Sequence, residues 1–266
     1  MRIISLLLIV IAFLSCKEDK KPITPEVKII AEVSSKKESY PESFSNILES
    51  HGGLSQWKLQ RTLSFIKPTS DGFEHYTIDL RERKEKVVSE NIERGFDGEN
   101  VWLLDPEKEF KGDAVFYNNL YFYFYSMPFV FADKGVNYNK TNDLVVNDQS
   151  FPGIKISFGD GIGTSPKDEY YLHYNPDTNE MAWLGYTVTY RTGEKSDKIS
   201  WIQYNDWQIV SGLKVPKSIS WHKTKGGKIL DVDKTIAFDN VTLSDKAMEN
   251  GYYAKPELAT VVVGKH

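Results

Sequence analysis

The side chains most able to do chemistry in this sequence are its five histidines, which lie far apart along the chain. They are His51, His75, His173, His222 and His266. None of the HxH, HExxH or CxxC spacings that bring metal ligands together occurs. We therefore expect no metal and no cofactor unless distant residues converge. His51 precedes two glycines at the end of an expected helix, where a histidine usually serves the helix dipole and the last carbonyl groups.

A pair of acids is the main alternative for catalysis. Asp168 and Glu169 precede an expected strand, with Asp160 nearby, and could bind a cation or act as acid and base. A solvated strand edge explains them as well. The glycine-rich segment 160–164 lacks the lysine of a phosphate-binding loop and indicates a tight turn. No GxSxG motif supplies a nucleophile, so we expect a non-enzymatic protein. A hydrolase is the less favoured hypothesis.

The only cysteine, Cys16, follows a segment with the layout of a secretion signal. Arg2 precedes an apolar run of about twelve residues, too short to cross a bilayer of about 30 Å as a helix. The ending Phe13-Leu14-Ser15-Cys16 resembles a bacterial lipobox, in which the cysteine is acylated and becomes the first residue of the mature protein. An ordinary signal peptide with an incidental cysteine is the alternative.

This motif predicts how the chain is organised and where in the cell it is located. We expect a signal peptide at residues 1–15, a lipidated cysteine and flexible tether at residues 16–40, and one domain at residues 41–266. Acyl chains such as palmitate would anchor the protein, since each buried methylene contributes about 0.8 kcal/mol. The segment Lys17-Glu18-Asp19-Lys20-Lys21 resembles export signals of Bacteroidetes-type lipoproteins. A lipid anchor in the bacterial outer membrane, on the periplasmic or cell-surface side, is therefore expected.

The most apolar stretch of the domain is residues 116–132, FYNNLYFYFYSMPFVFA. At helical spacing it forms two stripes, one of Phe116, Leu120, Phe124 and Met127 and one of Tyr117, Tyr121 and Tyr125. Asp113 is a plausible N-cap, and Pro128 should break the helix before a short second turn that ends at Ala132. A helix that is apolar nearly all round must be enclosed, and a curved sheet is the simplest enclosure.

The flanking chain has the two-residue period of β-strands. A first helix over Pro41–His51 is followed by roughly ten or eleven strands that short turns separate. Residues 85–93, 180–191 and 228–243 are each expected to form a single strand. The predicted fold class is α+β and mainly β: an antiparallel meander curled into an unclosed half-barrel around the apolar helical segment. The net charge of -4, with acids and bases interleaved, argues against a nucleic-acid partner.

Four short motifs carry a resemblance to a known family. They are His51-Gly52-Gly53, Met127-Pro128-Phe129, Asp133-Lys134-Gly135-Val136 and Gly212-Leu213-Lys214-Val215-Pro216. With these motifs the chain is similar to an uncharacterised family of Bacteroidetes-type lipoproteins. Its order of elements resembles, more distantly, the lipoprotein carriers LolA and LolB and the regulator RseB. That resemblance implies a LolA-like half-barrel whose cavity holds acyl chains, and lipid binding follows only as a hypothesis, since a shared fold does not carry activity.

The leading functional hypothesis is therefore a lipid or other hydrophobic ligand bound between helix and sheet. The expected lining residues are Phe116, Leu120, Tyr121, Phe124 and Trp183, and the hydroxyls of Tyr117, Tyr121 and Tyr125 would orient a head group. The alternative for the same rings is a packed core without a void. A structural or partner-binding surface lipoprotein, using exposed tyrosines and a sheet edge, is the alternative from another class. Its protein partner is not identifiable from the sequence.

Overall fold

Two short helices open the part of the chain that the structure describes. The computed structural model describes residues 40–159, 167–190 and 192–264. Helix α1 (Glu42–Ser50) buries Phe44, Ile47 and Leu48, which recur at the spacing of one helix face. Helix α2 (Leu54–Leu59) follows after Gly52 and Gly53, both at positive φ. A Cβ on Gly52 would lie 2.4 Å from the carbonyl oxygen of Gly212, so only glycine allows this close approach.

A first antiparallel sheet combines five strands that follow the helices with two from the C-terminal part. Its strands are β1 (Thr62–Thr69), β2 (Gly72–Asp79), β3 (Glu85–Val88), β4 (Glu93–Phe96), β5 (Val101–Leu104), β15 (Asp239–Ser244) and β16 (Thr260–Val261). Their order is β15-β1-β2-β3-β4-β5-β16. The prediction of one strand over residues 85–93 was wrong. The chain turns between Ser89 and Ile92, where a backbone hydrogen bond closes the β3–β4 hairpin.

A second antiparallel sheet contains most of the remaining strands. These are β6 (Val136–Lys140), β9 (Gly153–Phe158), β10 (Tyr170–Tyr174), β11 (Met181–Tyr186), β12 (Ser200–Val210), β13 (Leu213–Lys225) and β14 (Lys228–Ala237). Their order is β14-β13-β12-β11-β10-β9-β6, and a small hairpin of β7 (Leu144–Val146) and β8 (Gln149–Phe151) stands apart. Strand β11 is shorter than the strand expected over residues 180–191.

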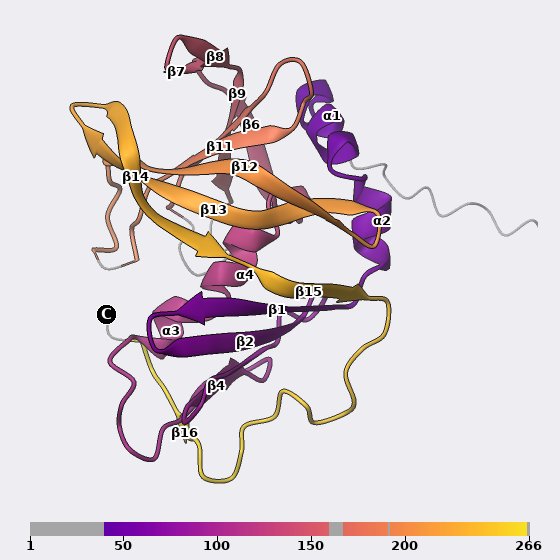
Figure 1. The fold of residues 1–266 in the computed structure, drawn as a ribbon, viewed down its shortest axis with the longest axis vertical. Coiled ribbons are helices and arrows are strands. Elements are labelled where there is room, and N and C mark those ends of the chain that lie inside the picture. Colours follow the sequence, from indigo (N-terminus) through magenta and orange to yellow (C-terminus); the bar gives the residue numbers. More distant parts are fainter. Residues whose placement is uncertain (1–39, 160–166, 191, 265–266) are drawn as a thin grey trace, which may run out of the picture. The chain divides into compact units, whose positions relative to one another are not determined.

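The two sheets meet at the junction between β14 and β15 (Figure 1). Residues 228–243 were expected to form one strand, but the chain leaves the second sheet at Ala237 and enters the first at Asp239. Phe238, between them, is buried, and its N–H donates to the carbonyl of Lys217. Among the described strands, the far edges β16 and β6 do not pair with each other. The predicted class is thus confirmed as mainly β, antiparallel and unclosed, with two sheets in place of one continuous meander.

The apolar segment predicted at residues 116–132, called the aromatic segment from here on, lies between the sheets (Figure 1). It forms three short helical pieces, α3 (Ala114–Tyr117), α4 (Leu120–Tyr125) and the 3-10 helix η1 (Phe129–Ala132). The predicted N-cap is confirmed, since the Asp113 side chain accepts the N–H groups of Val115 and Phe116. The predicted break before η1 is also confirmed. A second break was not foreseen: Asn119 adopts a left-handed conformation between α3 and α4.

Tertiary contacts produce that second break. The backbone N–H of Asn119 donates to the carboxylate of Glu85 over 3.1 Å, and its side-chain amide donates to the carbonyl of Arg83 over 2.9 Å. Both partners lie at the start of β3 or just before it, far away in sequence. Nothing in the local pattern of residues 114–125 contains this information.

The helices of the described residues are all too short or too polar to cross a lipid bilayer.

Candidate ligand-binding cavity

A cavity of about 360 Å³ lies between the aromatic segment and the second sheet. Its walls are mainly aromatic and aliphatic side chains from α3, α4, η1 and four strands of that sheet. They include Val115, Phe116, Tyr117, Leu120, Tyr121, Phe124, Met127, Val130, Phe131, Phe158, Tyr170, Tyr186, Val188, Tyr190 and Trp221. The volume is within the range of about 300 to 1,000 Å³ that is usual for small-molecule sites.

The side of the cavity formed by α3, α4 and η1, the helical wall, contains four of the five predicted ligand-binding residues. Phe116, Leu120, Tyr121 and Phe124 all line the cavity. The opposite face of α4 is packed core, since Phe122 and Tyr125 are fully buried. Tyr125 packs against Phe65 and Phe238, with ring centroids 5.2 and 4.8 Å away. The segment therefore has one face in the packed core and one face that borders the cavity, and ligand binding there stays a prediction.

The sheet wall is built from aromatic residues that the sequence analysis did not select. Tyr170 on β10 and Tyr186 on β11 are cross-strand neighbours, and their rings are nearly parallel at 6.4 Å. Trp221 on β13 donates its indole N–H to the hydroxyl of Tyr186 over 2.9 Å. Phe124 closes this group, since its ring lies 5.1 Å from Tyr186 and 5.5 Å from Trp221. The strand alternation around Tyr170 was visible in the sequence, but the pairing that brings these rings together was not.

Polar groups are few inside the cavity. The buried carboxylate of Asp168 accepts the N–H of Thr189 over 2.7 Å, and burial raises the pKa of Asp168. Burial also raises the pKa of the Tyr121 hydroxyl to about 12, so that it stays neutral. The cations are at the exposed rim, where the ammonium of Lys234 lies 4.5 Å from the centre of the Trp221 ring. The cavity thus has an apolar interior and a charged rim, where Lys134 and Lys234 outnumber the carboxylate of Asp133.

Trp183, the fifth predicted ligand-binding residue, lies elsewhere. Its side chain packs with Phe151 and Trp201 in a separate cluster, and its ring is 4.9 Å from that of His222. The reason is strand alternation: side chains at odd separations along a strand point to opposite faces. Tyr186 on the same strand lines the cavity, so Trp183, three residues earlier, lies on the other face.

The predicted acidic pair does not converge. Asp168 lines the cavity, whereas Glu169 pairs with Lys155 over 2.9 Å and accepts the hydroxyl of Tyr171. His173 is buried against Trp201 and contacts the carbonyl of Phe151. Asp160, the predicted turn at residues 160–164, His266 and Cys16 lie outside the described residues. Within the described ranges, no three His, Cys, Asp or Glu side chains gather as metal ligands.

His51 has a structural role different from the predicted one. Its ring does not return to the carbonyls of its own helix but ties α1 to the second sheet. Nδ1 donates to the carbonyl of Lys214 over 2.9 Å, and Nε2 accepts the N–H of Met181 over 3.1 Å. These two bonds require the neutral Nδ1–H tautomer. Burial accordingly lowers the pKa of His51 from 6.5 to about 4.

Tyrosine hydroxyls hold the helical wall in place. In a continuous helix the carbonyl of Phe124 would accept the N–H four residues later, but that residue is Pro128, which has none. The hydroxyl of Tyr204, on β12, donates to this carbonyl over 2.8 Å. Two more tyrosine hydroxyls bond to the carbonyls at the end of η1, Tyr138 to Phe131 and Tyr40 to Ala132. The position of the wall is thus set by the sheet that faces it.

Comparison with known proteins gives a family and a set of solved structures that align with most of the chain. A model described as "Family of unknown function (DUF6503)" matches residues 6–237. This match confirms the resemblance to an uncharacterised family. No protein with a curated description matches the sequence.

Several solved structures align with most of this chain, at TM-scores below 0.5. A LolA superfamily protein from Nitrosomonas europaea is 10% identical with a TM-score of 0.44, over 79% of this chain and 96% of that one. A DUF1329 family protein from Desulfovibrio piger is also 10% identical with a TM-score of 0.44, over 78% and 97%. A putative outer membrane lipoprotein-sorting protein domain from Vibrio parahaemolyticus is 8% identical with a TM-score of 0.36, over 79% and 97%. These likenesses concern the fold and not the function.

Proposed function

The chain belongs to DUF6503, a family of unknown function, and we propose that it binds a lipid or another hydrophobic molecule in the cavity between the aromatic segment and the second sheet. The observation that carries this proposal is the open space beside the rings of α4. Packed protein interiors leave few voids, so a space of about 360 Å³ walled by aromatic side chains requires an explanation. Burial of an apolar ligand there would remove this surface from water.

The distribution of polar groups favours an amphiphile over a pure hydrocarbon. The interior offers the carboxyl of Asp168 and neutral phenol hydroxyls such as that of Tyr121. The basic groups, Lys134 and Lys234, are exposed at the rim. An apolar chain inside the cavity, with an acidic or polar head group near these lysines, matches both regions. No step of this proposal requires catalysis.

The proposed setting is the bacterial outer membrane. It rests on the sequence, in which the thiol of Cys16 would carry acyl chains such as palmitate and residues 17–40 would tether the domain. Such an anchor would keep the cavity close to a source of lipids, on the periplasmic or the cell-surface side.

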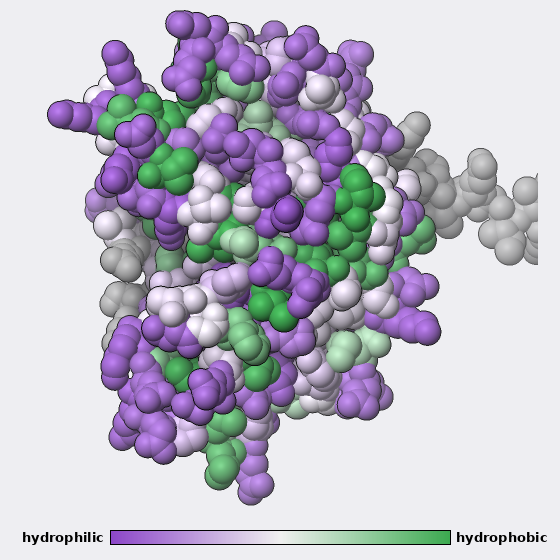
Figure 2. Space-filling model, in the orientation of Figure 1, coloured by the Kyte–Doolittle hydropathy of each residue, from purple (hydrophilic) through white to green (hydrophobic). Residues whose placement is uncertain are grey.

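A partner-binding protein without a small ligand is favoured less. That alternative needs aromatic rings on an outer surface, but among the described residues only Phe73 and Tyr123 are aromatic and strongly exposed. Figure 2 shows apolar residues in small groups separated by hydrophilic ones on the face in view. Scattered exposed apolar side chains are normal for a protein surface and do not indicate an interface.

Native mass spectrometry of the full chain purified from its membranes, followed by lipid extraction, tests the proposal. A Cys16→Ser form separates a bound ligand from the acyl chains of the anchor. Leu120→Trp should fill the cavity and lower ligand occupancy at least tenfold, because the indole would occupy the ligand's space. Val145→Trp is the matched control, since Val145 is exposed on β7. Repeated absence of an apolar ligand, or equal occupancy in both tryptophan variants, would overturn the proposal.

A further inference from the structure

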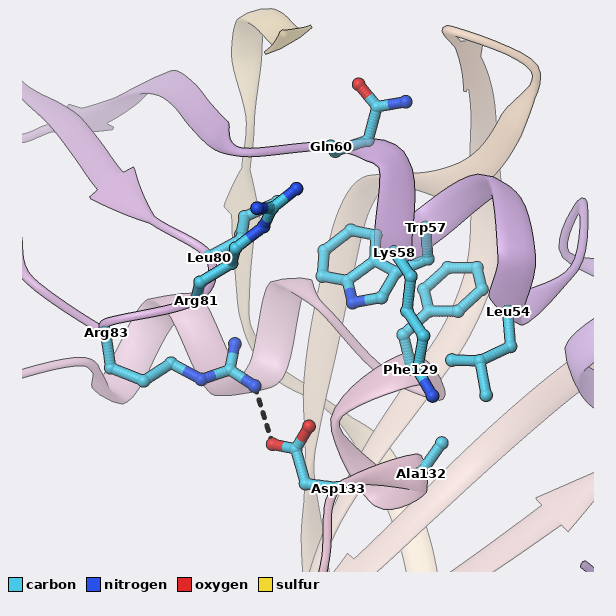
Figure 3. A pocket seen from close by; sticks show the side chains of 10 residues that line it. All are labelled: Leu54, Trp57, Lys58, Gln60, Leu80, Arg81, Arg83, Phe129, Ala132 and Asp133. Carbon is cyan, nitrogen blue, oxygen red and sulfur yellow. Dashed lines mark hydrogen bonds and ion pairs between the residues drawn. The ribbon is translucent and has the colours of Figure 1, made fainter. Parts of the chain in front are cut away.

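A second, chemically different pocket lies on the other side of η1 from the larger cavity. Figure 3 shows the side chains that line it. Its volume is about 260 Å³, and it is formed by α2, η1 and the turn between β2 and β3. The lining residues are Leu54, Trp57, Lys58, Gln60, Leu80, Arg81, Arg83, Phe129, Ala132 and Asp133. Helix η1 acts as the partition, because Phe129 and Ala132 line this pocket whereas Val130 and Phe131 line the larger cavity.

One side of the smaller pocket is an aromatic wall formed by two stacked rings. The rings of Trp57 and Phe129 are stacked, with centroids 4.7 Å apart and planes 6° from parallel. In Figure 3 the indole nitrogen of Trp57 lies on the ring edge toward Arg83. Its N–H has no hydrogen-bond acceptor among the described residues and is not fully enclosed, so it can donate to a ligand in the pocket. The wall therefore presents one available hydrogen-bond donor.

The other side is positively charged. Lys58, Arg81 and Arg83 line the pocket against a single carboxylate, that of Asp133. Arg83 is fixed, since its Nη2 lies 2.6 Å from the Asp133 carboxylate and its guanidinium is 4.8 Å from the centre of the Phe122 ring. Arg81 is exposed, and its guanidinium takes part in none of the ion pairs among the described residues. Its backbone is held by a hydrogen bond from its N–H to Asp79 over 2.9 Å.

We propose that this pocket is a second binding site, for a small organic anion that carries a planar apolar group. The planar group would pack against the edges of the stacked Trp57 and Phe129 rings, and the anionic group would accept from the guanidinium of Arg81 and the indole N–H of Trp57. Arginine is the side chain best matched to carboxylate and phosphate groups. Arg83 is already paired with Asp133, so it adds little net charge for the anion and mainly shapes the pocket. The site shares no apolar lining residue with the larger cavity, so it does not depend on the function proposed there.

Titration of the full-length protein with benzoate, followed by saturation-transfer NMR, tests this proposal, with benzyl alcohol as the uncharged probe. Benzoate should bind, and benzyl alcohol should bind at least about tenfold more weakly, as expected for the loss of hydrogen bonds to a charged group. Arg81→Gln should weaken benzoate binding about tenfold. Trp57→Phe keeps a ring in the wall and removes the N–H, and it should weaken benzoate binding severalfold.

The matched control is Lys228→Gln, which removes one positive charge from the exposed end of β14 and should leave benzoate binding unchanged. Leu120→Trp, which fills the larger cavity, should also leave it unchanged. Failure of benzoate to bind would overturn the proposal. So would equal affinity for benzyl alcohol, or an Arg81→Gln affinity equal to that of the wild type, because Arg81 is exposed and its replacement leaves the packing of the wall intact.

Discussion

The hydrogen bond from Tyr204 to the carbonyl of Phe124 allows a sharp test of how the helical wall is held. The Tyr204 side chain is buried, and its hydroxyl lies 2.8 Å from this carbonyl. Tyr204→Phe removes the donor and adds no atoms. Because Pro128 has no N–H to replace it, the buried carbonyl is left without a partner.

The expected cost of Tyr204→Phe is about 1 to 3 kcal/mol in the free energy of unfolding, the penalty for one unsatisfied buried polar group. In a domain of this size that corresponds to a fall in Tm of roughly 2 to 4 °C per kcal/mol. Urea denaturation of the full-length protein, followed by tryptophan fluorescence, measures the change. Ligand occupancy of the larger cavity should fall too, since Phe124 forms part of its wall.

Tyr125→Phe is the matched control on the same segment. The Tyr125 hydroxyl is buried and has no hydrogen-bond partner among the described residues. Its removal should leave stability unchanged or raise it by up to about 1 kcal/mol, because an unpaired buried hydroxyl is itself destabilising. A neutral Tyr204→Phe, or a Tyr125→Phe as destabilising as Tyr204→Phe, would show that this hydrogen bond does not hold the helical wall.

Two further predictions concern protonation and the anchor. The pKa of His51 is about 4 in the folded protein and 6.5 for an ordinary exposed histidine, so the unfolded chain binds more protons between these values. Its contribution to stability is therefore complete above pH 6.5 and falls by about 3 kcal/mol as the pH drops toward 4. In His51→Gln, the free energy of unfolding measured by urea denaturation should lose this part of its dependence on pH. An unchanged dependence on pH would contradict the prediction. Cys16→Ser should abolish acylation and move the protein out of the detergent phase in Triton X-114 partitioning, whereas unchanged partitioning would exclude the anchor.

Much of the local structure was predictable from the sequence because it depends on neighbouring residues. Asp113 caps α3 with its own side chain, and Pro128 ends the helical run because it lacks an N–H. The face of α1 follows from the spacing of Phe44, Ile47 and Leu48. The antiparallel class follows from short turns between strands of period two.

The strand boundaries and part of the candidate site were not predictable in this way. The sequence around Phe238 predicts one continuous strand. The chain changes sheets there because β14 pairs with β13 whereas β15 pairs with β1. Trp183 is as aromatic as Tyr186, and only the register of β11 decides which of them faces the cavity. A period of two gives two faces but does not say which one is inside.

The apolar segment, its cap, its break and the two alternating faces of the strands were predictable from the sequence, since propensity, capping and side-chain period act over a few residues. Three features depend on contacts between distant parts of the chain: α4 has one packed face and one open face, Tyr170, Tyr186 and Trp221 form the opposite wall, and η1 separates two pockets of different chemistry. Long-range pairing across the sheets creates those juxtapositions, and a local pattern contains no record of it.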